Sequence, residues 1–386
     1  MDSTAAPVTT VAVISTWVGF EVGLIQDAMA QLGQQAQAYT FFLQSLPYSY
    51  YPILTLLLVY LLSATGRDFG PMLHAERRAL EKGQVLRPGA QPAGGAPVSV
   101  AGDDESAEPA NPWLAGLPIL AVILTTALGL YFGGREGALA ANLENPSLRE
   151  VLNHADSFTV LTWASLTGAT LAVLLSVAAG RLKLGEAMEG YLEGARAMLI
   201  AVTILVLAWS LSAVCEKLDT AGFLVHVSQQ VLSARLLPSV VFVLAAAVSF
   251  ATGTSWGTMA ILMPLVYPLG LELPVAAGLA PDVALHIHLA SVSAVLAGAV
   301  FGDHCSPISD TTIMSSLACG SDHVDHVRTQ LPYSLTTGTI AVVFGYLPVG
   351  LGVAPWVSLL LGALAIVLVV WRLGKVPGLG SEGERA

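Results

Sequence analysis

Long apolar segments are the feature that most constrains what this chain can fold into. A helix that crosses a bilayer needs about 20 mostly apolar residues, and runs of that kind occupy 8–27, 44–64, 113–133, 158–180, 197–215, 334–352 and 355–373. Only 11% of the residues are charged, whereas a soluble domain carries about a quarter. The sequence therefore predicts an all-α, polytopic transmembrane helix bundle whose main partner is the lipid bilayer.

The charge balance and the cysteines exclude several other classes. The formal net charge of −11 provides no basic surface for phosphates, which argues against a nucleic-acid partner. Cys215, Cys305 and Cys319 lack the paired spacing of a disulfide framework or a zinc site. The sequence also has no motif for a nucleotide, haem or flavin, so we expect no cofactor.

The region 237–318 departs from the simple series of spans. Two apolar arms of 14 residues, 237–250 and 258–271, flank the polar tip 252–257. Because 14 residues are too few to span a bilayer comfortably, this pattern predicts a re-entrant hairpin. The helix that follows is expected to be broken, because Gly302 and Pro307 interrupt it.

The distribution of Lys and Arg predicts the orientation, because cytoplasmic loops collect these residues. The segment 65–112 is polar, rich in Pro, Gly and Ala, and basic near its start, so we expect a disordered cytoplasmic linker. It would separate membrane helices in 1–64 from a membrane transport domain in 113–373, followed by a cytoplasmic tail, 374–386. With a re-entrant hairpin, most of the 16 Lys and Arg residues lie inside. Since no signal-peptide pattern precedes the first apolar run, we expect a multi-pass protein of the cell (inner) membrane.

Polar residues at membrane depth mark the candidate site. Ionisable groups there are costly and are commonly functional, and broken helices build the cation sites of many secondary transporters. Carboxylate, hydroxyl and carbonyl oxygens suit Na⁺, with Asp310 and Asp303 as the charged ligands. The candidate ion-binding residues are Asp310, Asp303, Ser306, Ser309, Thr311, Thr312, Thr254, Ser255 and Thr252.

Purely structural interpretations of the same residues stay open. The segment 298–316 could be a polar loop at the membrane surface, and the tip could be a patch of small residues for close helix packing. We expect Asp2 to be exposed, Glu21 to lie at the membrane interface, and 322–328 to form a solvated turn. An intramembrane aspartyl protease is disfavoured because the chain contains no Tyr-Asp pair, so we do not expect an enzyme.

Several strings resemble the NhaC family of sodium/proton antiporters. They are SFATGTSWGTMAILMPL at 249–265, GDHCSPISDTTIMSS at 302–316, DHVRTQLPY at 325–333 and AWSLSAVCEKL at 208–218. The resemblance implies a secondary active transporter that exchanges Na⁺ for H⁺. We expect both ions to share one carboxylate site, with Asp310 as the titrating group because the SDTT string surrounds it with hydroxyls, and Asp303 second.

The resemblance leaves two further functions open. Some members of the family couple sodium and proton movement to malate and lactate, so transport of a small carboxylate is the alternative within transport. The pattern also starts in mid-family, because DSTAAPV begins at residue 2. One alternative is therefore a truncated, non-transporting subunit that needs a partner chain to supply the N-terminal helices. The other is a chain that acts alone or as a homo-oligomer.

Overall fold

The described helices fall into two compact units. The computed structural model describes residues 2–13, 15–34, 37–90, 111–146, 148–192, 210, 214, 217 and 233–378. Unit 1 comprises Met1–Val11, Ser45–Asp104 and Cys215–Ala386, and unit 2 comprises Ala12–Gln44 and Glu105–Val214. Within the described residues the regular elements are helical, apart from one isolated β-bridge between Asp68 and Lys375. The predicted all-α fold is confirmed.

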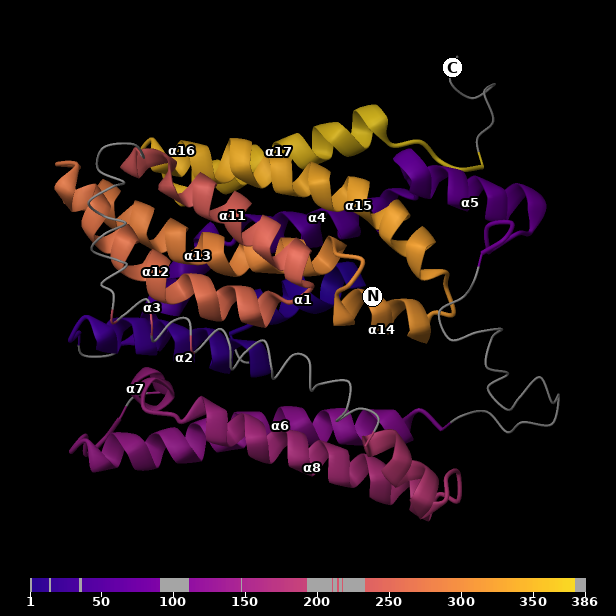
Figure 1. Ribbon diagram of the computed structural model, residues 1–386, viewed down its shortest axis with the longest axis horizontal. Coiled ribbons are helices and arrows are strands. Elements are labelled where there is room, and N and C mark those ends of the chain that lie inside the picture. The colour runs from indigo at the N-terminus through magenta and orange to yellow at the C-terminus, as the bar shows by residue number, and fades with distance from the viewer. Residues whose placement is uncertain are drawn as a thin grey trace. The chain divides into compact units, whose positions relative to one another are not determined.

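Unit 1 contains most of the helices (Figure 1). They are α1 (Asp2–Val11), α4 (Tyr50–Thr65), α5 (Gly70–Lys82), α11 (Leu237–Thr252), α12 (Ser255–Ala276), α13 (Pro281–Cys305), α14 (Asp310–Ala318), α15 (His323–Ile340), α16 (Leu347–Gly350) and α17 (Pro355–Leu373). Shorter turns of 3-10 helix lie at Leu46–Tyr48 and Ala234–Leu236, and a π-helical turn at Ala341–Tyr346 joins α15 to α16. Unit 2 holds α2 (Thr16–Gln31), nearly all of α3 (Ala38–Ser45), α6 (Trp113–Ala140), α7 (Leu148–Asn153) and α8 (Ser157–Ala178).

Most predicted spans are found as helices. Six of the described helices are long and apolar enough to cross a membrane, and the bent pair Ala38–Tyr48 with Tyr50–Thr65 would make a seventh. The predicted span 355–373 coincides with α17, whereas 197–215 lies almost wholly outside the described residues. The span 8–27 is wrong: the chain leaves the helix after Val11, and Ser15 begins α2 by accepting a hydrogen bond from the Val18 N–H.

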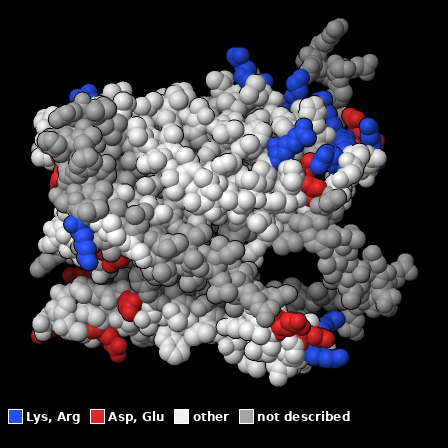
Figure 2. Space-filling model, viewed as in Figure 1, with Lys and Arg blue, Asp and Glu red and all other residues white. Residues whose placement is uncertain are grey.

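The surface of unit 1 fits a bilayer. Large apolar side chains of α17 are exposed, among them Trp356, Leu360, Leu364 and Trp371. A soluble protein rarely exposes such a run. Figure 2 shows charged side chains gathered at the end where α5 lies, while the visible flank of the neighbouring helices is uncharged. This distribution is that of a polytopic membrane protein.

Helices α11 and α13 run parallel and in very close contact. A Cβ added to Gly298 would lie 2.6 Å from the Phe242 carbonyl oxygen, and one added to Gly302 would lie 2.5 Å from the Phe250 backbone nitrogen. Two glycines four residues apart on one helix face let the backbones approach, as in other membrane helix pairs. The Ser249 hydroxyl adds a 2.6 Å hydrogen bond to the Ala299 carbonyl oxygen.

The expected 14-residue hairpin arms are wrong. Helix α11 has 16 residues and forms with the preceding 3-10 turn a stretch of 19, Ala234–Thr252, while α12 has 22; both stretches are long and apolar enough to be spans. Helix α12 continues past Gly270 because that residue packs against His288 and Ser291 of α13. Two full crossings return the chain to the same face as a re-entrant hairpin would, so the orientation predicted from Lys and Arg is unchanged.

The expected disorder of 65–112 is wrong for its first part. Helix α5 forms there, with Pro71 in its first turn and Gly83 in the left-handed conformation after its last residue. That placement of Pro and Gly is typical of helix boundaries. Two contacts hold the segment to α15: the Tyr333 hydroxyl donates to Asp68 Oδ1 at 2.8 Å, and Arg87 pairs with Asp325 at 2.9 Å. Residues 91–110 lie outside the described part.

The α11–α13 contact predicts the effect of a single methyl group. Gly302→Ala should lower the free energy of unfolding by about 1–3 kcal/mol, the usual cost of overpacking. Gly133→Ala in α6 is the matched control, because a Cβ there meets nothing within 4 Å. Thermal midpoints in detergent, followed by size-exclusion chromatography, should fall for Gly302→Ala and not for the control. Equal midpoints would contradict the close packing.

Candidate functional site

The break between α13 and α14 forms the centre of the candidate site. Helix α13 ends at Cys305, residues 306–309 are non-helical, and α14 begins at Asp310. Pro307 lies in the break as predicted. The expectation that Gly302 also interrupts the helix is wrong, because this residue lies within α13 and packs against the backbone of α11. The break frees backbone groups beside a carboxylate, which is what a cation site in a membrane requires.

Asp303 is the buried carboxylate at this break. Its side chain is only 1% exposed. The Ser255 hydroxyl donates to Oδ2 at 3.2 Å, and the Ser309 hydroxyl donates to Oδ1 at 2.7 Å. Ser309 also contacts the Thr311 hydroxyl at 2.8 Å, and Thr312 donates to the Asp303 carbonyl oxygen at 3.4 Å. Four of the predicted hydroxyl residues therefore gather around Asp303.

The tip between α11 and α12 closes over the break. Gly253 has a φ of 68°, a left-handed conformation that ends α11. A Cβ on Gly253 would lie 2.6 Å from the Ile308 carbonyl oxygen, so the two turns touch backbone to backbone. Thr254 begins α12 by accepting the Gly257 N–H, which leaves Ser255 directed at Asp303. Helices α11, α12 and α13 thus converge at one place.

Two predicted hydroxyl residues are placed differently, and the side chain of Asp310 is not described. Ser306 donates to the Phe250 carbonyl oxygen at 2.8 Å and so ties the break to α11. Thr252 is exposed, and its hydroxyl bonds to the Val248 carbonyl oxygen of its own helix. Asp310 occupies the first position of α14, but its side chain lies outside the part that the structure describes. Its expected role stays a prediction.

A second buried polar group was missed by the sequence reasoning. His304 follows Asp303, is 2% exposed and contacts the Tyr51 hydroxyl at 2.6 Å through Nδ1. The Gln330 amide donates both to the His304 carbonyl oxygen and, at 2.9 Å, to Asp2 Oδ2. Asp2 is therefore buried, and the expectation that it is exposed is wrong. The signal available in the sequence was Gln330, a polar residue near the middle of the segment that forms α15.

The segment 322–328 is not a solvated turn. Asp322 accepts the Asp325 N–H at 2.9 Å and starts α15. His323 contacts the Pro307 carbonyl oxygen at 2.6 Å, and His326 contacts the Ser316 hydroxyl at 2.8 Å. The first turn of α15 therefore contacts both the break and α14.

Glu21 also differs from its expectation. It is fully buried in α2 of unit 2, and neither carboxylate oxygen has a hydrogen-bond partner among the described residues. An uncompensated buried carboxylate is costly, which marks Glu21 as a residue of interest away from the break.

The arrangement at the break suits a monovalent cation better than a transition metal. Within the described ranges, no three His, Cys, Asp or Glu side chains gather as metal ligands. A cation beside Asp303 would meet one carboxylate together with hydroxyl and carbonyl oxygens, the hard ligands that alkali ions prefer. Burial makes an isolated charge costly, and the hydrogen bonds from Ser255 and Ser309 offset part of that cost.

These features define a multi-pass membrane protein with a buried carboxylate at a helix break. Residues 8–351 match the sequence pattern of the Na⁺/H⁺ antiporter family. Since the match covers most of the 386 residues, the chain belongs to this family of transporters. No solved structure gives a significant match.

Similar proteins include antiporters of several substrates. The chain is 29% identical over 378 residues to an uncharacterized protein of Haemophilus influenzae, covering 97% of this chain and 67% of that protein. It is 33% identical over 152 residues to an uncharacterized Na⁺/H⁺ antiporter of the same organism, covering 38% of this chain and 29% of the relative. It is 31% identical over 163 residues to the malate-2H⁺/Na⁺-lactate antiporter of Bacillus subtilis, covering 40% of this chain and 30% of that protein. The chain thus aligns with about two thirds of the first relative and less than a third of the other two.

The contact between tip and break predicts a difference between two glycines. Gly253 and Gly278 both have positive φ, but a Cβ on Gly278 would meet nothing within 4 Å. Alanine at either position costs about 1–2 kcal/mol of conformational strain, and only Gly253→Ala adds a collision with Ile308. Thermal midpoints in detergent should therefore fall further for Gly253→Ala than for Gly278→Ala. Equal losses would show that the tip does not rest on the break.

Proposed function

We propose that the chain is a secondary active transporter that exchanges Na⁺ for H⁺ across the cell (inner) membrane. The observation that carries the proposal is Asp303, a buried carboxylate that accepts hydrogen bonds from Ser255 and Ser309 at the helix break. Family membership supports antiport, and the chemistry of these oxygens supports Na⁺ as the cation.

One site can serve both ions by competition. A proton and Na⁺ each neutralise the carboxylate, so binding of one displaces the other. Ser309 and Thr311 can turn their hydroxyl protons away and offer lone pairs when a cation arrives. Asp310, at the first position of α14, is the proposed second carboxylate. The contacts of the described side chains favour Asp303 as the group that holds the ion.

A second candidate is sodium- and proton-coupled transport of a small carboxylate. The similarity to the malate-2H⁺/Na⁺-lactate antiporter favours it. Against it, no Lys or Arg occurs in the sequence between Arg235 and Arg328, which includes α11 to α14. An organic anion at the break would therefore have to be held by backbone N–H groups and hydroxyls alone.

The experiment measures lumenal pH in proteoliposomes with an acidic lumen and an enclosed pH dye. External Na⁺ should make the lumen more alkaline for the wild type, because Na⁺ enters as H⁺ leaves. Asp303→Asn and Asp310→Asn should abolish this response, since an amide cannot exchange a proton for a cation. Asp282→Asn is the matched control, because Asp282 is exposed in the first turn of α13, far along that helix from Asp303.

The alternatives give different results in the same assay. Alkalinisation that requires malate or lactate together with Na⁺ would favour the second candidate. Near-normal exchange by Asp303→Asn would contradict the proposed role of the carboxylate.

A further inference from the structure

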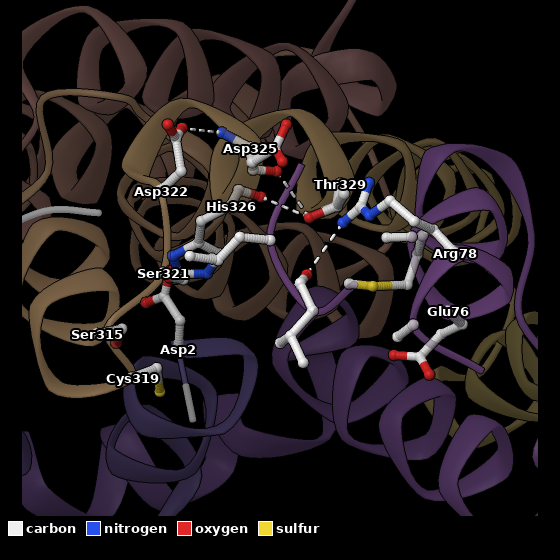
Figure 3. A pocket seen from close by; sticks show the side chains of 15 residues that line it. Asp2, Glu76, Arg78, Ser315, Cys319, Ser321, Asp322, Asp325, His326 and Thr329 are labelled. Atoms are coloured by element: carbon white, nitrogen blue, oxygen red, sulfur yellow. Dashed lines mark hydrogen bonds and ion pairs between the residues drawn. The ribbon is translucent and has the colours of Figure 1, made fainter. Parts of the chain in front are cut away.

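A pocket of about 310 Å³ lies within unit 1, next to the break but distinct from it. Helix α5 forms one wall, and the end of α14 with the first turns of α15 forms the other (Figure 3). Asp2, the first residue of α1, also lines the pocket. Segments that are far apart in the sequence therefore line one open pocket, whose largely apolar wall of α5 faces the carboxylates of Asp2, Asp322 and Asp325.

Asp2 is a buried carboxylate in this pocket, and its role in packing does not account for all of its polar atoms. It is 3% exposed, and its Oδ2 accepts a 2.9 Å hydrogen bond from Gln330 and lies 3.6 Å from His326 Nε2. Its Oδ1 has no hydrogen-bond partner among the described residues. A buried carboxylate oxygen without a partner is costly, so a ligand at this oxygen would be stabilising.

The charges around the pocket indicate what that ligand is. Glu76, Asp322 and Asp325 line the pocket together with Asp2 and His326. Such a surplus of carboxylates raises the local concentration of cations and repels anions.

Two arginines offset part of this negative charge, and Arg78 itself lines the pocket. Arg78 donates to the carbonyl oxygens of Gln84 and Val85, each at 3.1 Å. Arg87 pairs with Asp325 at 2.9 Å. Neither guanidinium is shown to reach Asp2, whose one described ion-pair partner is His326. The space beside Asp2 Oδ1 is therefore open to a mobile cation such as Na⁺.

The pocket is linked to the break by one side chain. The Gln330 amide bridges Asp2 Oδ2 and the carbonyl oxygen of His304, the residue directly after Asp303. We propose that Asp2 is a second cation-binding carboxylate, an entry site that holds Na⁺ in the pocket beside α5 before it reaches Asp303. This inference rests on the proposed function and extends it to a residue and a pocket outside the break.

The first test compares the Na⁺ concentration for half-maximal exchange in proteoliposomes. Asp2→Asn should raise it on the order of tenfold, the effect expected for loss of one charged contact, while the maximal rate changes less. Asp2→Glu, which keeps the charge, should retain most of the affinity, and Asp282→Asn should match the wild type. Asp303→Asn, in contrast, should abolish exchange at every Na⁺ concentration.

The second test does not depend on turnover. Cys319 is exposed and lines the pocket, so it can report on occupancy. A positively charged methanethiosulfonate reagent should label Cys319 in detergent more slowly with NaCl than with choline chloride at equal ionic strength. Asp2→Asn should lose this protection by Na⁺, and Cys319→Ser identifies the labelling that belongs to other cysteines.

The outcomes separate this inference from the proposed function. Normal exchange with an unchanged half-maximal concentration in Asp2→Asn would overturn the entry site alone. Equal labelling of Cys319 in NaCl and choline chloride would also overturn it, even if Asp2→Asn does not fold. Absence of Na⁺/H⁺ exchange in the wild type, with Na⁺ still protecting Cys319, would overturn the proposed function and leave the cation site standing.

Discussion

The close parallel packing of α11 and α13 is the constraint on which the rest of unit 1 depends. Gly298 and Gly302 remove the side chains that would separate the two backbones. As a result both helices end at the same level, and the turn after α11 meets the break after α13 at Gly253 and Ile308. The antiparallel α12 then begins beside Asp303 and can direct Ser255 at it. Without that approach, the hydroxyls and the carboxylate would belong to separate helix ends.

Burial of Asp303 sets the chemistry that this packing makes available. A carboxylate removed from water requires a proton, a cation or several hydrogen bonds. Ser255 and Ser309 donate hydrogen bonds to it, and under the proposed function a proton or Na⁺ supplies the remaining stabilisation. Asp2 is likewise a buried carboxylate, located at the pocket beside α5. Gln330 lies between Asp2 and the backbone next to Asp303. Its amide joins the Asp2 carboxylate to the backbone carbonyl there, which is the physical basis for the proposed stepwise movement of a cation.

Much of this could be predicted from the sequence, and the failures have identifiable causes. Hydropathy located α6, α8 and α17, because membrane burial dominates their composition. The polar strings at 252–257 and 302–316 identified Ser255, Asp303 and Ser309 as neighbours, since each interrupts an apolar helix. The lengths of α11 and α12 were underestimated because the arms were bounded by the apolar runs 237–250 and 258–271, whereas both helices continue into the polar tip and α12 also extends past Gly270, which packs against α13. Asp2 and α5 could not be predicted, because their burial depends on contacts with Gln330, Tyr333 and Asp325 that are distant in sequence.

The central claim is that Na⁺ and a proton compete for the carboxylate at the break. Proton release on Na⁺ binding tests it most directly, with purified protein in weakly buffered detergent and a pH indicator. Addition of NaCl should acidify the solution to a saturating extent, choline chloride should not, and Asp303→Asn should lose the release. Saturable Na⁺ binding that liberates no proton from the wild type, or release that persists in Asp303→Asn, would contradict the account.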